Sequence, residues 1–272
     1  MILSSDQASL AFIGGTGFEK LPNFIETGRY DFETPFGAPS SPVIRGELFG
    51  EQVAFVSRHG EEHTIPPHKI NYRANIWALN AAGISTIVGL AAVGGIDADM
   101  VSGCIVIPDQ LIDYTWGREH TYYDGMIDKE SGVSRSLDHI EFASPYTNAL
   151  RKQLIDASGE AQIDVFTSAV YGVSQGPRLE TAAEINKMER DGVKIIGMTG
   201  LPEASLAREL RMSYATIAMV VNEAAGRGAE EITMDGIRAN LITATSSVAR
   251  ILEYFVRIYS EGQTPRIAPN FG

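Results

Sequence analysis

Short apolar runs of strand length alternate along the chain with segments whose apolar residues recur at helical spacing. The runs predict strands at residues 10–13, 53–56, 84–93, 104–107, 165–171, 195–198 and 214–221. The helical patterns occupy residues 68–82, 145–157, 180–190, 203–210 and 235–259. Several runs are too uniformly apolar for a strand with one wet face, which indicates a sheet covered on both sides. The alternation predicts an α/β fold with a largely parallel sheet, in a single domain that spans residues 1–272.

Nothing in the chain marks a second domain. We find no internal repeat, no low-complexity tract and no linker rich in Pro, Gly or Ser. The segment 114–142 is rich in Gly, Asp, His and Ser and is long for a connection, so we expect it to be functional or to contact another subunit. The tail at residues 263–272 carries two prolines, and we expect it to trail over the surface.

Composition narrows the class of protein. The 272 residues include 34 acidic and 22 basic ones, which gives a formal net charge of −12, and the basic residues form no cluster. Such a surface repels phosphate backbones and anionic lipid, so we expect no nucleic-acid partner and no membrane partner. No apolar run reaches the roughly 18 residues that a spanning helix requires. One cysteine, Cys104, and a polar start without a secretory pattern indicate a cytoplasmic protein.

Three stretches that follow predicted strands carry groups suited to an anion. Two glycines precede Thr16, so that backbone N–H groups can approach an anion and the Thr16 hydroxyl can add a donor. Arg58 and His59 follow another run, and an arginine fork matches phosphate oxygens while the histidine supplies a further donor. Thr199 follows the run at 195–198. A tight turn or a surface ion pair would explain each stretch alone, but their coincidence predicts an anion site.

A metal site competes as an explanation for the histidines. His59, His63 and His68 are three of the five histidines of the chain, at spacings that could suit zinc. Two prolines between His63 and His68 prevent one continuous helix, and no cysteine or His-x-x-Glu pattern completes a ligand set. We therefore expect no metal.

Two further stretches carry groups that can recognise a polar heterocycle. Glu180 stands near the start of a predicted helix, where an acid is also favoured simply by the helix dipole. Asn222 ends an apolar run, where it could also be an ordinary turn residue. The small residues at 91–95 would let a ligand come close to the sheet. Open α/β sheets bind ligands at the carboxyl ends of their strands, so we expect all these stretches to meet at one pocket.

These stretches match, in the same order, motifs of the family of trimeric purine nucleoside phosphorylases and methylthioadenosine phosphorylases. The sequence resembles this family over nearly the whole chain. The motifs are Gly-Gly-Thr-Gly at 14–17, Ser-Arg-His-Gly at 57–60, the run at 68–79, Gly-Pro-Arg at 176–178, Gly-Met-Thr at 197–199 and Pro-Glu-Ala at 202–204. The resemblance implies a mixed, largely parallel twisted sheet flanked by helices, and a homotrimer or a dimer of trimers. It also implies that the enzyme uses inorganic phosphate as a co-substrate and needs no cofactor.

The resemblance assigns roles to residues at the phosphate and the sugar. The implied phosphate ligands are Thr16, Arg58, His59, Thr199 and, through backbone contacts near phosphate and sugar, Ala91 and Ala92. Met198 would lie under the ribose, and His139 would reach the 5′ group from a neighbouring subunit. We also expect a locally positive cleft around Arg58 within this acidic protein.

The resemblance also predicts which nucleoside is bound. The base would meet Leu179, where the family usually has Phe, and the set Glu180, Asn222 and Ala224. Glu with Asn is the pair of the 6-oxopurine phosphorylases, whereas an Asp pair favours a 6-aminopurine. At the 5′ end, Met234 stands where those enzymes place a His, and an apolar Met suits a methylthio group. The implied catalytic residues are Asn222, His59 and Glu180.

The expected reaction is phosphorolysis of 5′-methylthioinosine to hypoxanthine and 5-methylthioribose 1-phosphate. The alternatives are a methylthioadenosine phosphorylase, a general inosine and guanosine phosphorylase and, from a different class, a binding module for a nucleoside or phosphate without turnover. Release of free base without phosphate would indicate a nucleosidase. The protein is expected to act on small molecules alone.

Overall fold

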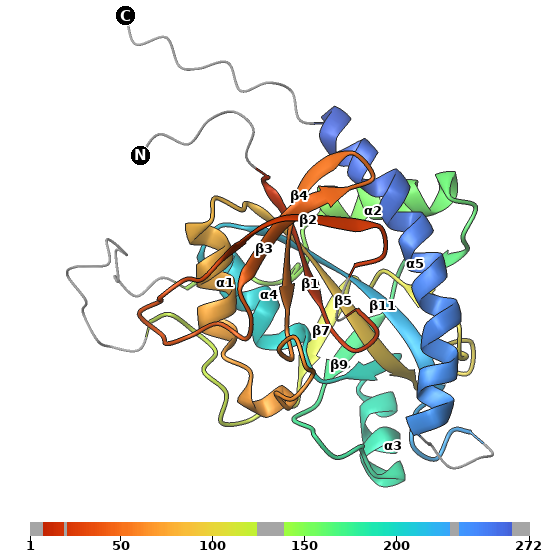
Figure 1. Ribbon diagram of the computed structural model, residues 1–272. Coiled ribbons are helices and arrows are strands. Elements are labelled where there is room, and N and C mark those ends of the chain that lie inside the picture. Colours follow the sequence, from red (N-terminus) through yellow and green to blue (C-terminus); the bar gives the residue numbers. More distant parts are fainter. Residues whose placement is uncertain (1–7, 19–20, 124–138, 229–233, 263–272) are drawn as a thin grey trace, which may run out of the picture.

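A twisted sheet crosses the molecule, with helices on both of its faces (Figure 1). The computed structural model describes residues 8–18, 21–123, 139–228 and 234–262. The strands in these ranges are β1 (Leu10–Gly14), β2 (Phe24–Tyr30), β3 (Val43–Leu48), β4 (Glu51–Ser57), β5 (Thr86–Gly95), β6 (Ile105–Val106), β7 (Gln110–Asp113), β8 (Val165–Phe166), β9 (Val170–Val173), β10 (Ile195–Gly197) and β11 (Ser213–Glu223). The helices are η1 (Pro67–Lys69), α1 (Tyr72–Ala81), α2 (Asn148–Glu160), α3 (Ala182–Arg190), α4 (Gly200–Glu209) and α5 (Met234–Gly262).

The sheet is mixed and mostly parallel, as the sequence predicts. Its strand order is β2-β3-β4-β1-β5-β10-β9-β7, and β11, β6 and β8 extend it from β5. β1 runs parallel to β4 and β5, and β11 runs parallel to β5. β2, β3 and β4 form an antiparallel meander, and β10 runs antiparallel to β5.

Strand β5 changes neighbours along one of its edges. On one side it pairs with β11 along its whole length, Thr86–Gly95. On the other side, residues 86–89 pair with β1 and residues 94–95 pair with β10. Between them, residues 90–93 have no strand partner on that side within the described ranges. Because β1 is parallel to β5 and β10 is antiparallel to it, the carboxyl ends of β1 and β10 converge on this split in the sheet.

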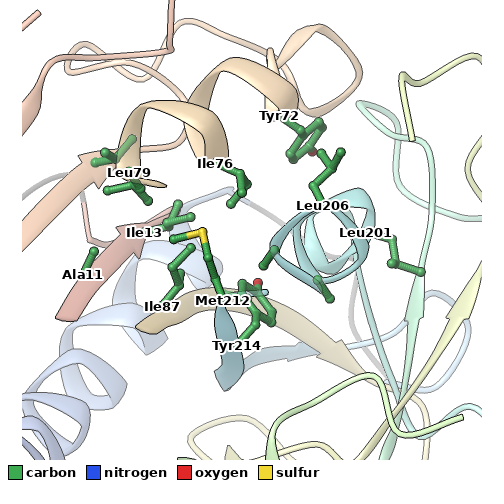
Figure 2. Close-up of a cluster of buried hydrophobic side chains, with 14 of the residues drawn as sticks. Ala11, Ile13, Tyr72, Ile76, Leu79, Ile87, Leu201, Leu206, Met212 and Tyr214 are labelled. Carbon is green, nitrogen blue, oxygen red and sulfur yellow. The ribbon is translucent and has the colours of Figure 1, made fainter. Parts of the chain in front are cut away.

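Two apolar layers attach the helices to the sheet. On one face, Ile76 of α1 and Leu206 of α4 gather with Ile13 of β1 (Figure 2). On the other face, Leu154 of α2 and Val248 of α5 belong to a second buried cluster. Within the described ranges, no helix combines the length and the apolar character that crossing a bilayer would require.

The structure differs from the predicted elements in three places. The prediction of one strand at residues 165–171 is wrong, because exposed Thr167 and Ser168 separate β8 from β9. The predicted helix at 68–82 is divided into η1 and α1, and Asn71 caps α1 by accepting a bond from the backbone N–H of Ala74 at 3.1 Å. The apolar runs do not predict β2, β3 and β7, since polar residues interrupt each of these strands.

Candidate active site

A cavity of about 250 Å³ opens at the split in the sheet. It brings together eleven of the residues predicted for the site, which are Thr16, Arg58, His59, Ala91, Ala92, Leu179, Glu180, Met198, Thr199, Asn222 and Ala224. The other lining residues are Gly15, Pro67, Val93, Gly94, Pro177, Ile196, Gly197, Val221, Ala225 and Ile237. The predicted stretches therefore meet at one place, although β10 approaches it in the direction opposite to β1.

Arg58 is the most deeply buried charged residue of the cavity wall. It is 1% exposed and pairs with Glu203, which is 0% exposed. The Nε of Arg58 donates to Glu203 Oε1, and Nη2 donates to Oε2 at 2.9 Å. Nη1 donates to the carbonyl of Leu90 at 2.9 Å and lies so close to Gly15 that a Cβ there would be 2.6 Å from it. Gly15 is thus required for the guanidinium to fit beside the turn.

This ion pair determines how much of Arg58 remains available at the cavity wall. The two-pronged face of Arg58 binds Glu203, so that only Nη1, beside the cavity-lining Gly15, is left to meet a phosphate. Burial works against the charged guanidinium, but the Glu203 carboxylate outweighs it and raises the pKa of Arg58. Arg58 is the one cationic side chain that lines the described cavity, and Glu203 compensates its charge. The locally positive cleft stays a prediction, and in it the neutral donors of the wall would assist the single remaining nitrogen of Arg58.

Glu203, the partner of Arg58, is a candidate functional residue to which the sequence analysis gave no role. It lies on α4, 145 positions from Arg58, and its Oε2 also accepts a bond from the Tyr214 hydroxyl at 2.8 Å. Figure 2 shows Tyr214 in the apolar layer beneath α4. The available signal was the Pro-Glu-Ala motif at 202–204, which places an acid in a segment that is otherwise apolar.

His59 is neutral in this environment. Burial, followed by the charge of Arg58, lowers its pKa to about 4. Its Nδ1 lies 2.8 Å from the carbonyl oxygen of Ile65, which can only accept, so Nδ1 carries the proton. Nε2 of the neutral ring is then an acceptor, and the expected role of His59 as a donor to phosphate stays a prediction. Its ring packs against that of His63, with centroids 4.7 Å apart and the ring planes tilted by 39°.

Two threonines frame the same end of the cavity. Thr16 stands in the turn after β1, with Oγ1 3.4 Å from Nε2 of His63. Thr199 is 7% exposed at the start of α4, and its side chain does not cap that helix. Both threonines line the cavity, and Ala91 and Ala92 of β5 line it as well. The two threonine hydroxyls are neutral donors that can add to the one nitrogen, Nη1, that Arg58 has left for an anion.

The base end is built from the segment after β9. Ser174 donates its hydroxyl hydrogen to Oε1 of Glu180, which holds the carboxylate in place. Leu179, next to it, is 44% exposed at the mouth of the cavity. Thr181 caps α3 by a capping box with Glu184, and this fixes where the segment ends.

Asn222 reaches the cavity through a bulge in β11. Val220 pairs with Val93 and Asn222 pairs with Gly94, so Val221 is an extra residue in the strand. Such a bulge re-aims the side chains that follow it. A Cβ at Gly94 would lie 3.3 Å from Nδ2 of Asn222, so the glycine makes room for the amide. Ala224 closes this corner, and its backbone N–H donates to the carbonyl of Gly95 at 2.7 Å.

The sequence predicts Met234 and His139 for the 5′ end, and of these only His139 has a described side chain, which does not line the cavity. Met234 is the first residue of α5, and its side chain lies outside the described part of the structure. His139 is exposed. Ile237, three residues after Met234, does line the cavity and gives this wall an apolar side chain. Ile237 could have been found from the helical apolar pattern at 235–259.

The described histidines, cysteine and acids do not gather as metal ligands. No group of three or more of these side chains in the described ranges is arranged to hold an ion.

The fold is that of an α/β protein, and its cavity is lined by hydroxyl groups, a guanidinium, a carboxylate and a carboxamide. The model of the phosphorylase superfamily matches residues 9–257. A probable S-methyl-5′-thioinosine phosphorylase of Xylella fastidiosa is 46% identical over 250 residues, which are 92% of this chain and 98% of that protein. The 6-oxopurine nucleoside phosphorylase of Pyrococcus furiosus is 44% identical over 82% of this chain and 83% of its own.

The structural comparison agrees with the sequence comparison. The methylthioadenosine phosphorylase of Schistosoma mansoni in complex with adenine matches with a TM-score of 0.86 and 31% identity, over 94% of this chain and 93% of that one. The chain belongs to the phosphorylase superfamily. It is an enzyme of the nucleoside phosphorylase class, a pentosyltransferase, as the resemblance of its motifs implies.

Proposed function

We propose that the protein catalyses the phosphorolysis of 5′-methylthioinosine, giving hypoxanthine and 5-methylthioribose 1-phosphate. The observation that carries the proposal is that Glu180 and Asn222 line one cavity together with Arg58 and Thr199. A carboxylate accepts the N1–H of a 6-oxopurine, and a carboxamide donates to O6 and N7. Adenine has an acceptor at N1 and a donor at the 6-position, so the same pair would leave groups unmatched at about 1–3 kcal/mol each.

The cavity supports a mechanism of positioning and electrostatic stabilisation. The bond from C1′ to N9 breaks, its electron pair stays with the purine, and a phosphate oxygen forms the new bond to C1′. The proton that monohydrogen phosphate gives up reaches the purine through solvent, so that neutral hypoxanthine leaves. Asn222 stabilises the developing negative charge on the purine through N7. Thr16, Thr199 and Nη1 of Arg58 hold the phosphate, while Nε2 of His59 accepts from an oxygen that bears a proton, as in monohydrogen phosphate. No electrons are exchanged with a cofactor, so inorganic phosphate is the only co-substrate.

The preference for a methylthio group rests on the wall formed by α5. Ile237 gives that wall an apolar side chain, and an apolar Met stands one helical turn earlier in the sequence. A 5′-hydroxyl buried there without a partner is disfavoured, whereas a thioether is not. The name of the Xylella relative agrees with this preference. The Pyrococcus relative makes a general 6-oxopurine nucleoside phosphorylase the second candidate.

The wider setting of the reaction forms part of the proposal. We place the enzyme in purine salvage, as a homotrimer or a dimer of trimers in the cytoplasm. The single cysteine fits a reducing compartment. Exposed His139 and the open base end fit a site that a neighbouring subunit completes. Light scattering of the purified protein tests the oligomeric state. Assay of a His139→Ala variant with the methylthio nucleoside tests whether a neighbouring subunit completes the site.

The proposal is tested by product analysis with and without phosphate. Methylthioinosine, methylthioadenosine, inosine and guanosine are incubated in parallel, and base and sugar products are identified by mass. We expect methylthioribose 1-phosphate and hypoxanthine, formed only when phosphate is present. Free methylthioribose without phosphate would indicate a nucleosidase, and equal turnover of inosine would favour the second candidate. No turnover of any nucleoside would contradict the proposal.

A further inference from the structure

A second buried arginine, Arg118, lies outside the machinery described above. It follows β7 and is 8% exposed. Unlike Arg58, it pairs with no carboxylate of the described residues; its acceptors are neutral oxygens. Burying a cation whose described acceptors are all neutral is costly, and packing alone does not require it. The bonds that Arg118 makes therefore indicate its purpose.

The guanidinium of Arg118 joins two segments that are far apart in the sequence. Its Nη2 donates to the carbonyls of Ser174 at 3.1 Å and Gln175 at 3.0 Å, and its Nε donates to the Gln175 side chain at 3.2 Å. Its Nη1 donates to the carbonyls of Met198 and Leu201, both at 2.8 Å. The sixth acceptor is the hydroxyl of Tyr72 on α1, at 3.1 Å from Nη1.

Each of these segments carries one end of the substrate site. Ser174 is the residue whose hydroxyl holds the carboxylate of Glu180. Met198 lines the cavity, and Met198 and Leu201 stand on either side of Thr199. Arg118 thus sets the separation between the group that reads the base and the groups that meet ribose and phosphate.

We propose that Arg118 is a positioning residue that couples base recognition to the sugar subsite, although it lines no part of the cavity. The identity of the substrate in this inference rests on the proposed function, whereas the hydrogen bonds of Arg118 do not depend on it. Because five N–H groups in one plane serve two segments, a lysine with a single nitrogen cannot replace them fully. The phosphate end has its own support in Arg58 and Glu203, so loss of Arg118 acts mainly through the nucleoside.

The test compares Arg118→Met and Arg118→Lys with Arg151→Met. Arg151 is a matched control, because it also donates to backbone carbonyls, those of Ile107, Pro108 and Thr167, but lines no part of the cavity. We expect Arg118→Met to lower kcat/KM for the nucleoside about 30-fold or more, with the KM for phosphate within about threefold, and Arg118→Lys to recover part of the loss. Arg151→Met is expected to leave kcat/KM within about threefold.

A double-mutant cycle with Glu180→Gln separates positioning from general damage. If Arg118 acts through Glu180, Arg118→Lys costs clearly less in the Glu180→Gln background than in the wild type. Additive losses, or equal losses in both KM values, would overturn the proposal. An Arg151→Met variant as impaired as Arg118→Met would overturn it as well.

Amide hydrogen exchange of the ligand-free protein provides a readout that needs no substrate. We expect Arg118→Lys to accelerate exchange in residues 174–180 and 198–201 together, and Arg151→Met to leave both unchanged. Exchange that changes in neither segment would contradict the positioning role. If no purine nucleoside is turned over but both segments loosen, the proposed function fails and the structural role of Arg118 stands.

Discussion

The two ends of the cavity are built in different ways. At the phosphate end, Arg58, Glu203, His59 and Thr199 are each at most 7% exposed, and only Thr16 is partly buried. At the base end, Leu179 is 44% exposed, and Glu180 and Asn222 are only partly buried. The phosphate end is thus part of the core of the chain, and the base end is part of its surface.

This difference predicts where stability and specificity reside. A buried ion pair cannot lose one partner without leaving the charge of the other uncompensated. Substitutions at the phosphate end are therefore expected to lower the stability of the protein as well as its activity. Substitutions at the base end change which hydrogen bonds a bound base can make, so they are expected to change specificity at little cost in stability. The base end is also the part of the site that a neighbouring subunit can still complete.

The largest effect is expected for Arg58→Met. The substitution leaves Glu203 buried without a counter-ion, and we expect the free energy of unfolding to fall by about 3–5 kcal/mol. Loss of a preorganised donor at the phosphate is expected to lower kcat/KM at least about 100-fold. Urea denaturation and initial rates measure the two quantities. Arg29→Met is the control, because Arg29 pairs with Glu26 and Glu61 at the surface and little change is expected there. Equal unfolding midpoints for the two variants would contradict the contrast.

His59 is expected to make the phosphate end sensitive to acid. Its pKa is about 4 in the fold and about 6.5 in an unfolded chain, so the unfolded state binds more protons between these values. Stability should therefore fall as the pH is lowered from about 6.5 to about 4, by about 3 kcal/mol in total, and this contribution should level off below that range. Denaturation across this range, compared with His59→Asn, isolates the contribution. Identical pH profiles for the two proteins would rule it out.

Asn222→Asp is expected to change specificity without unfolding. A carboxylate at this place accepts from a 6-amino group and repels a 6-oxo group. The ratio of kcat/KM for methylthioinosine to that for methylthioadenosine is expected to fall about 10-fold or more, for a change of about 1–3 kcal/mol. Asn186→Asp on α3, outside the cavity, controls for the added charge. An unchanged ratio would show that Asn222 does not read the base.

Tyr214→Phe is the mildest test of the phosphate end. It removes the hydroxyl that donates to Glu203 at 2.8 Å but keeps the ion pair with Arg58. We expect a loss of about 1 kcal/mol in unfolding free energy and no change in the preference between the two methylthio nucleosides. A change in that preference would mean that the two ends are less independent than their burial suggests.

Local patterns predict the cavity wall well, because strand ends and glycines are visible in one sequence. The apolar runs before Thr16, Arg58 and Thr199 indicate that those residues follow strands, and the strands deliver them to one place. The same reasoning assumes that the carboxyl ends of parallel strands meet. In the structure β10 is antiparallel to β5, and the meeting point is the split in the sheet.

Pairings across the chain cannot be predicted in this way. Glu203 and Arg58 are separated by 145 positions. The sequence around neither residue reveals that the Glu203 carboxylate binds the side of the guanidinium expected to bind phosphate. The bulge at Val221 has no signature in an apolar run, yet it turns Asn222 into the cavity. Tertiary contacts of this kind decide charge and orientation, which a list of residue types does not contain.

A competition experiment tests the central claim most directly. Equal concentrations of methylthioinosine and methylthioadenosine share one reaction with saturating phosphate, and hypoxanthine and adenine are quantified at early times. The ratio of their initial rates equals the ratio of the two kcat/KM values. The account predicts that hypoxanthine forms at least about 10 times faster, as expected when Glu180 and Asn222 read a 6-oxopurine. Adenine formed as fast as hypoxanthine, or faster, would contradict it.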